Sequence, residues 1–470
     1  MEPGATAHST RRISKSGRLA PAIAGTLIHA VNVALAAEAT TQHTLWDDPG
    51  FEVVRTSAAV ENARENFSRR GVTVEAKYIG EVFTNPHGGF AGGSHYHGLL
   101  DIETDLDLEK LLGWKGLTFH ANGYQSHGTS ITAESVGSIA AVSHIEATPT
   151  TRLFEAWFEQ SALDGTLSLR FGQLAVDAEF ATLPSAGAFI SSTFGWNTLM
   201  TDNVPNGGPI YPLATPGARL KFQPTDSVSM MAAIYNGDPV GECSDDPQKC
   251  NAHGTEFRLS DPPLVIGEAA YQSGAELPGV LKAGAWWSFE DFDDQRFADD
   301  GSALADPSGS GAARRHDGNG GVYAVIHQML YRVSDSPERG IHAFARAARS
   351  IEDRNQIDFY LEVGITLTGL LDARPGDVLG IGFAHSHISE SAAGFDRDLS
   401  NFNSIKLPVR QAEQLLEISY TAQLTKGWSV QPDFQYYWSP GGHVADSSDP
   451  SGLRTIPNAA VFGLRTILAY

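Results

Sequence analysis

The sequence lacks the features of several protein classes. It has no internal run of 18 or more apolar residues, which excludes membrane spans made of helices. Basic residues are scarce, 33 against 55 acidic ones, and this argues against nucleic acid as a partner. No G-x-S-x-G elbow occurs, and the pairs His95/His97 and His385/His387 have no evident third or fourth ligand nearby. We therefore expect no enzyme, no metal site and no cofactor.

Cysteine is nearly absent. The two cysteines, Cys243 and Cys250, lie in a stretch rich in Asp and Pro. Two ligands are too few for a zinc site, whereas a chain that is exported can oxidise such a pair. We predict that Cys243 and Cys250 form a disulfide within a loop.

The N-terminus has the pattern of a secretory signal peptide over residues 1–36. Residues 19–35 are mostly apolar and small, and residues 34–36 read Ala-Leu-Ala, which fits a cleavage site. The basic residues that precede this run are Arg11, Arg12, Lys15 and Arg18. Removal of residues 1–36 would take away these four and Glu2, leaving 29 basic and 54 acidic residues and a net charge of −25.

Residues 37–71 are mostly polar, and within them Ser57–Arg70 predicts one short helix that ends at Gly71. We interpret 37–71 as a periplasmic N-terminal segment. From Val72 onward the pattern changes to alternation of apolar and polar residues, which is typical of strands with one apolar face. We therefore assign 72–470 to a single β domain.

The alternation is clearest after residue 99. Leu100, Ile102, Thr104, Leu106 and Leu108 alternate with Asp101, Glu103, Asp105, Asp107 and Glu109. Five carboxylates on one strand face must meet water, because each unpaired buried carboxylate would cost several kcal/mol. The opposite face is apolar, so the strand separates an apolar environment from an aqueous one.

About sixteen segments of this kind follow, most of them long enough to cross a bilayer as tilted strands. The doubtful segment is Thr255–Leu259, and a single-chain bacterial barrel should have an even number of strands. The chain ends with Phe462, Leu464 and Tyr470 on one face and Arg465 on the other. We predict an all-β fold, a transmembrane antiparallel up-and-down β-barrel of sixteen strands around an aqueous channel.

Other residues complete this expectation. Six tryptophans near strand ends suggest girdles at the membrane interface: Trp114, Trp157, Trp286, Trp287, Trp428 and Trp438. The long stretch Asp177–Pro216 is too apolar for a free surface loop, and we predict that it folds into the channel; an external loop packed on its own aromatics is the alternative. Residues 290–320 read as an exposed acidic loop, and whether its acids bind calcium stays open.

The chain resembles the carbohydrate-selective porins of the OprB type across most of its length. The segments that carry this resemblance are Arg69–Val72, Asn85–Gly89, Asp107–Gly116, Leu169–Gln173, Tyr211–Arg219, Phe289–Gln295 and Gln431–Gly442. The family implies a sixteen-stranded barrel in the bacterial outer membrane, among its lipids and lipopolysaccharide. It also implies passive diffusion of glucose and related small neutral sugars. The terminal Tyr470, where Phe is commoner, and the cysteine-bearing loop depart from the family pattern.

The alternative function is a general, non-selective diffusion porin for small hydrophilic solutes, and homo-oligomer formation is left open by the sequence. In either case the pore needs a wet constriction with hydrogen-bonding side chains. The candidates for a substrate-binding constriction are Glu75, Lys77, Glu155, Arg170, Gln173, Trp196, Tyr211, Arg219, Glu268, Arg346, Glu362, Asp433 and Gln435.

Overall fold

The structure is a computed structural model that describes residues 58–274, 276–333, 336 and 338–470. The predicted signal peptide and residues 37–57 lie outside the described residues. The described residues from 64 onward belong to one compact unit. Among the described residues, no helix is both long enough and apolar enough to cross a bilayer.

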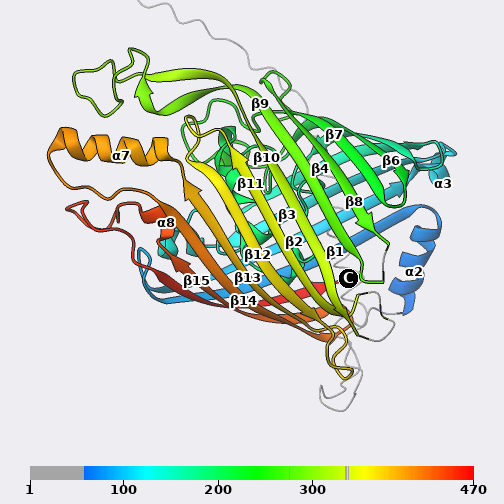
Figure 1. The fold of residues 1–470 in the computed structure, drawn as a ribbon. Helices are drawn as coiled ribbons and strands as arrows, with labels where there is room; N and C mark the ends of the chain where they lie inside the picture. The colour runs from blue at the N-terminus through cyan, green and yellow to red at the C-terminus, as the bar shows by residue number, and fades with distance from the viewer. Residues whose placement is uncertain (1–57, 275, 334–335, 337) are drawn as a thin grey trace, which may run out of the picture. The chain divides into compact units, whose positions relative to one another are not determined.

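The described chain forms sixteen strands, and each pairs antiparallel with its neighbours in sequence (Figure 1). The last strand pairs with the first, so the sheet closes into a barrel. This confirms the predicted fold class and strand number. The strands are β1 (Val72–His87), β2 (Gly93–Asp107), β3 (Leu117–Gly128), β4 (Thr150–Ala162), β5 (Leu167–Leu174), β6 (Thr215–Thr225), β7 (Val228–Asn236), β8 (Pro263–Ser273), β9 (Gly279–Ala298), β10 (Ala313–Arg332), β11 (Gly340–Ser350), β12 (Ile357–Thr368), β13 (Val378–Ile388), β14 (Ala412–Thr425), β15 (Trp428–Trp438) and β16 (Ala459–Ala469).

The helices are short and lie before β1 or in the connections between strands. Helix α2 precedes β1 and confirms the predicted N-terminal helix, and α7 is the longest helix between strands. The helices are α2 (Ala58–Arg69), α3 (Leu108–Leu112), α4 (Ser192–Gly195), α5 (Thr198–Asp202), α6 (Pro247–Cys250), α7 (Glu390–Asn403) and α8 (Pro440–His443), with the single turns η1 (Thr132–Val136), η2 (Ala186–Ala188) and η3 (Pro205–Gly207).

The connections at the two ends of the barrel differ in length. At the end that carries Tyr470, β6 joins β7 through residues 226–227 and β14 joins β15 through 426–427. At the other end, β5 joins β6 through 175–214 and β7 joins β8 through 237–262. Bacterial outer-membrane barrels have short periplasmic turns and long extracellular loops, so the end with Tyr470 is the periplasmic one.

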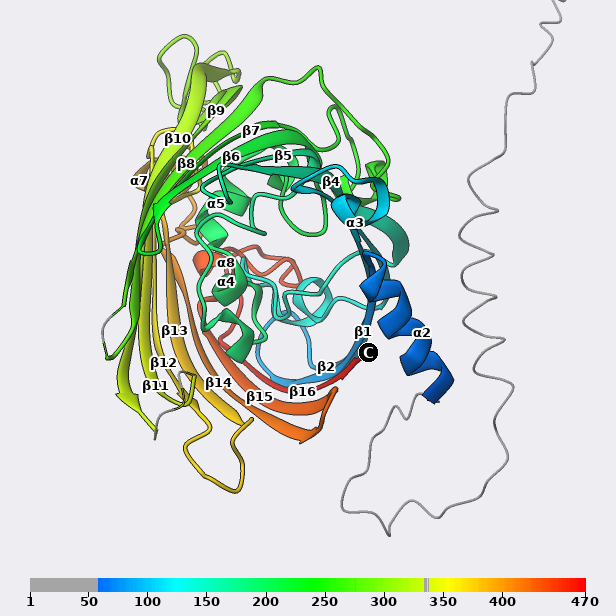
Figure 2. The same cartoon turned by 90° about the vertical axis from the view of Figure 1, so that its right-hand side faces the viewer.

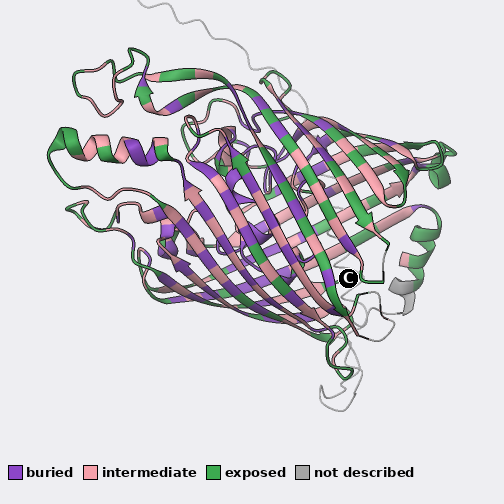
Figure 3. Ribbon diagram, in the orientation of Figure 1, coloured by how far each residue is buried: buried purple, intermediate pink, exposed green. Residues whose placement is uncertain are grey.

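The two faces of the barrel wall differ as the alternation predicts. Along the strands, buried residues alternate with exposed or intermediate ones (Figure 3). In β16, Phe462 and Leu464 are exposed by 54% and 51%, whereas Val461 and Arg465 are buried. Asp101 in β2 is also buried and forms an ion pair with Lys77 of β1. Apolar side chains therefore face outward and the charged ones face the lumen.

The long loop between β5 and β6 folds into the barrel, as predicted (Figure 2). The Glu417 carboxylate of β14 accepts hydrogen bonds from the backbone nitrogens of Ile190 and Ser191 in this loop, at 2.5 and 3.1 Å. Phe189 and Phe194 of the loop stack on each other and contact Phe344 of β11 edge-on. The loop therefore packs against the inner wall through both polar and apolar contacts.

The prediction that residues 290–320 form a loop is wrong. Its two flanks continue β9 and β10, and only 299–312 connect them. Charged pairs across the two strands, such as Arg315 with Asp293 at 2.8 Å, stabilise this extension. Charged residues stand on both faces of the extension, beside Phe292 and Phe297, so the regular apolar alternation of the other strands is broken and the sequence pattern looked like a loop.

Two further expectations are corrected. Strand β2 ends at Asp107, so Leu108 and Glu109 do not continue its alternation as expected but begin α3. The Asp107 carboxylate accepts a hydrogen bond from the Lys110 nitrogen (3.1 Å) and caps this helix. Trp157 and Trp286 do not belong to an interfacial girdle. Trp286 is buried in the lumen cluster, and Trp157 lies beneath the Arg170 guanidinium at 3.6 Å. A tryptophan near a strand end can face either side of the wall, and only the register decides which.

Candidate functional site

A cavity of about 590 Å³ lies inside the barrel between the wall formed by β1–β4 and the inward loops. Its wall residues share lumen-facing strand positions, and its loop residues come from the three connections β3–β4, β5–β6 and β7–β8. The lining includes Lys77, Asp101, Asn122, Tyr124, Phe154 and Glu155 from the strands, and His144, Asp177, Trp196, Tyr211 and Gln248 from the loops.

One side of the cavity is aromatic. Tyr124 stacks on Phe154 with ring centroids 5.0 Å apart, and Tyr211 packs against both at 5.4 and 5.8 Å. Tyr211 is held in place because its hydroxyl donates to the Ile145 carbonyl (2.9 Å) and its backbone nitrogen donates to the Asp177 carboxylate (3.1 Å). The cavity therefore presents a rigid apolar surface next to polar groups, as small-molecule sites commonly do.

The other side of the cavity is polar. Lys77 and Asp101 form an ion pair at 3.2 Å, and the Asn122 carbonyl oxygen accepts from the Glu155 backbone nitrogen at 3.0 Å. Among the described residues, Asp101 Oδ1 and Asp177 Oδ1 are shielded and have no hydrogen-bond partner. Burial raises the pKa of the Asp177 carboxyl group to about 6. Both carboxyl groups therefore lie largely in the cavity wall, and the Lys77–Asp101 pair supplies charge to this side of the cavity.

The structure brings four of the predicted constriction residues to this cavity: Lys77, Glu155, Trp196 and Tyr211. The Glu155 side chain also accepts from the Ala175 nitrogen (2.8 Å), where the long loop begins. Glu155 and its neighbour Phe154 both turn inward because one extra residue bulges β4 against β3.

Arg170 and Arg219 do not line this cavity. They lie opposite each other on β5 and β6 and share the carboxylates of Glu159 and Glu179. Arg219 is 1% exposed and also donates to Ser168 at 2.7 Å. Because Glu179 belongs to the long loop, this network ties the start of that loop to the wall.

Most remaining predicted residues also hold loops. Arg346 donates to the carbonyls of Ala181 and Thr193 in the long loop and pairs with Glu362 at 3.0 Å. Glu268 accepts a hydrogen bond from the Ala181 nitrogen, and Gln173 donates one to the Gly254 carbonyl. Gln435 donates to the Val142 carbonyl and to Asp433. Among the described residues Glu75 holds no loop, and it is exposed near the periplasmic end of β1.

Several cavity residues were missed in the sequence: Asp101, Asn122, Tyr124, His144, Asp177 and Gln248. Asp101 was placed on the water-facing side of its strand, and Asn122 and Tyr124 lie two positions apart on the next strand, so the period of two carried a signal for all three. The loop residues His144, Asp177 and Gln248 carried none, because their positions depend on how three separate loops fold together.

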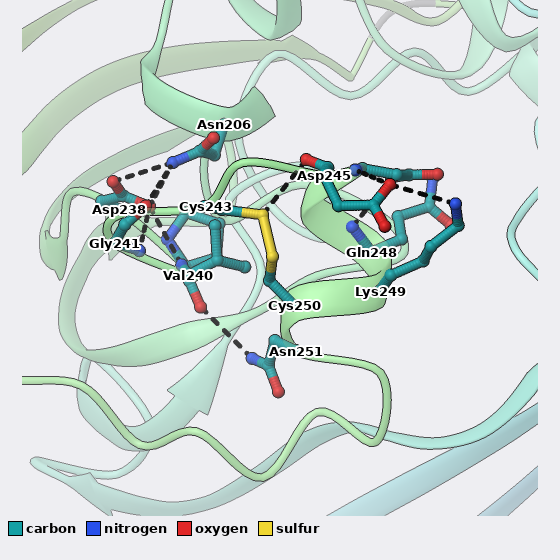
Figure 4. Close-up of a disulfide and its surroundings, with 12 residues drawn as sticks. Asn206, Asp238, Val240, Gly241, Cys243, Asp245, Gln248, Lys249, Cys250 and Asn251 are labelled. Carbon is teal, nitrogen blue, oxygen red and sulfur yellow. Dashed lines mark hydrogen bonds and ion pairs between the residues drawn. A yellow bond between two sulfur atoms is a disulfide. The ribbon is translucent and has the colours of Figure 1, made fainter.

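The structure joins Cys243 and Cys250 in a disulfide within the β7–β8 loop (Figure 4). In the described part of the chain, no group of three or more His, Cys, Asp or Glu side chains is arranged to hold a metal ion. Acids within residues 299–312 instead accept hydrogen bonds from neighbouring side chains and backbone nitrogens, as Asp300 does from Ser302.

Comparisons with known proteins agree with this architecture. The sequence profile of the family described as "Carbohydrate-selective porin, OprB family" matches residues 91–470. Porin B of Pseudomonas aeruginosa is 25% identical over 425 residues, which cover 86% of this chain and 88% of that protein. The putative porin QuiX of Acinetobacter baylyi is 21% identical over 81% of this chain and 87% of its own length. The high-pH structure of Pseudomonas putida OprB has the same fold, with a TM-score of 0.78 and 23% identity over 87% of this chain and 97% of that one.

Proposed function

Because this chain belongs to the carbohydrate-selective porin family OprB, we propose that the cavity beside Tyr211 is where it selects glucose and related small neutral sugars. The protein is a carbohydrate-selective porin of the outer membrane, and so a transport channel. Solutes pass by diffusion, so the site must bind weakly enough to release them.

The observation that carries the proposal is that the aromatic side, made by Tyr124, Phe154 and Tyr211, and the Lys77–Asp101 ion pair line the same cavity. The C–H face of a sugar ring can pack on the aromatic side, while its hydroxyls hydrogen-bond to charged and amide groups. The cavity volume of about 590 Å³ also lies within the range of roughly 300–1,000 Å³ that is typical of small-molecule sites.

Liposome swelling tests this function. Vesicles containing the purified protein are placed in an isotonic solution of D-glucose or of a zwitterionic dipeptide of similar mass and zero net charge. We expect glucose to enter faster, because the dipeptide ends are charged and lack the ring of hydroxyls. Entry rates that follow solute size alone would contradict sugar selection and favour the general porin.

We also propose that residues 1–36 direct export and are removed, and that 37–71 stay in the periplasm. Strand β1 begins at Val72 at the barrel end with short turns, and this supports a periplasmic position for the segment before it. Sequencing the N-terminus of protein purified from outer membranes should give Ala37 as the first residue. A start at Met1 would contradict cleavage.

A further inference from the structure

The disulfide closes a short segment of the β7–β8 loop whose two flanks also make hydrogen bonds (Figure 4). On the Cys243 side, the Gly241 carbonyl accepts a hydrogen bond from Asn206 of the long loop at 3.1 Å. On the Cys250 side, Asn251 donates to the Pro239 carbonyl at 3.2 Å. With both flanks fixed and the cysteines joined, residues 244–249 have little freedom to move away from the lumen.

Gln248 is the residue of this closed segment that reaches the cavity. Its side-chain oxygen accepts from the Thr148 backbone nitrogen at 2.7 Å. Its backbone carbonyl accepts from the buried Arg152 at 2.8 Å, and its backbone nitrogen donates to Asp246 at 2.9 Å. The two backbone bonds fix the turn at Gln248, and the bond from the Thr148 nitrogen orients the side-chain amide.

The amide nitrogen of Gln248 is left available. Among the described residues it has no hydrogen-bond partner, although the amide oxygen is fully engaged. A primary amide nitrogen can only donate. The cavity therefore has an oriented donor on its loop side.

We propose that Gln248 is a specificity-determining residue that donates a hydrogen bond to a hydroxyl of the passing sugar, and that the Cys243–Cys250 disulfide holds it in position. This inference rests on the proposed function of the cavity. A sugar hydroxyl both donates and accepts, so a donor on the loop side of the cavity adds to the groups that the strands present. Gln248 supplies such a donor from the β7–β8 loop.

The first experiment separates sugar contact from loop support. Single-channel KCl current is measured while D-glucose is added to the native protein and to Gln248→Glu. The glutamate keeps an oxygen for the Thr148 nitrogen but replaces the NH₂ donor with an acceptor. We expect glucose block, read relative to the sugar-free current of each channel, to need about tenfold more sugar, the effect of one lost hydrogen bond.

Lys249→Ala is the matched control, because Lys249 lies on the same segment, is exposed and pairs only with Asp245. Its glucose block should equal that of the native protein. If Gln248→Glu also blocks like the native protein, Gln248 has only a structural role and the inference fails. If glucose does not block the native protein at all, the proposed function fails instead, and the two failures are thus distinguishable.

The second experiment tests the disulfide. Cys243→Ser/Cys250→Ser should weaken glucose block by about threefold to tenfold, and combining it with Gln248→Glu should give no weaker block than Gln248→Glu alone, since both changes act through one amide. Dithiothreitol on the native protein, which gives two electrons and two protons to the disulfide and closes to its own cyclic disulfide, should have the same effect. Native-like block in both the serine variant and the reduced protein would overturn the role of the disulfide.

Discussion

Glu81 and Arg465 form an ion pair across the seam where the first strand of the barrel meets the last. Both side chains are buried in the lumen wall. Arg465 also donates to the Ser143 hydroxyl at 3.3 Å, which ties the β3–β4 loop to the same seam. Barrel closure and loop placement therefore share one guanidinium.

Replacing Arg465 with Leu should destabilise the barrel by about 3–5 kcal/mol, because it leaves the Glu81 charge buried and unpaired. Urea unfolding in lipid vesicles measures this difference. The control is Arg454→Leu, whose side chain is 72% exposed and pairs with Asp449 at 3.5 Å, and which should change stability by less than about 1 kcal/mol. Equal unfolding midpoints for the two variants would contradict the role of the seam.

The ring of Tyr211, more than its hydroxyl, should determine sugar binding. Tyr211→Leu removes the aromatic face, and we expect glucose block of the KCl current to weaken by about fivefold. Tyr211→Phe keeps the ring and loses only the bond to the Ile145 carbonyl, so its block should stay close to native. A larger loss in the Phe variant than in the Leu variant would show that the aromatic surface is not the contact.

Asp177 should make the cation preference of the pore depend on pH. Burial raises its pKa to about 6 from an ordinary 3.8, so the carboxyl group becomes neutral as pH falls through about 6. Cation preference, read from the reversal potential across a KCl gradient, should fall between pH 7 and pH 5, and fall less in Asp177→Asn. An identical pH profile in the variant would exclude Asp177 as the group responsible.

The raised pKa of Asp177 also makes the stability of the fold depend on pH. Because the folded-state pKa is raised, the contribution of Asp177 to folding is fully present below its ordinary value of 3.8 and is lost as pH rises through about 6. Asp177→Asn, which is neutral at every pH, should therefore stabilise the protein relative to the native chain above pH 6 and not below pH 4. Urea unfolding at the two pH values checks this.

Arg346 should hold the long loop against the wall. Its guanidinium donates to the carbonyls of Ala181, Thr193 and Phe194, so Arg346→Leu should raise the mean KCl conductance and increase current fluctuations. Arg346→Leu should also lower the free energy of unfolding by about 3–5 kcal/mol, because Glu362 is left buried and unpaired.

The double variant Arg346→Leu/Glu362→Leu separates these two effects. It removes the unpaired charge and should recover most of the stability, but the loop carbonyls still lack their donor and the fluctuations should persist. Quiet, native-like current in both variants would show that Arg346 does not anchor the loop.

The barrel was predictable because a wall between hydrocarbon and water imposes a period of two on every strand that crosses it. Phe462 and Arg465 fall on opposite faces in the sequence and in the structure. The period of two gave no guidance where the strands extend beyond the part of the wall that separates hydrocarbon from water. Arg315 and Asp293 lie on strands that extend beyond the alternating region, and their pairing depends on register, which composition does not reveal.

The site was less predictable than the wall. Lys77 and Tyr211 were identified, but the residues that complete the cavity include Asp177 and Gln248 from two different loops. Their positions follow from hydrogen bonds between loops that are distant in sequence, such as that from Thr148 to Gln248. Arg170 and Arg219 lie on the predicted lumen face, yet shared carboxylates occupy their donors, and only the structure shows that.

The most direct test is the KCl current through single native channels as D-glucose is added. A sugar that occupies the cavity beside Tyr211 displaces ions from the narrow part of the lumen, so the current should fall with glucose concentration and saturate. An ion current that millimolar glucose leaves unchanged would contradict sugar binding in the lumen.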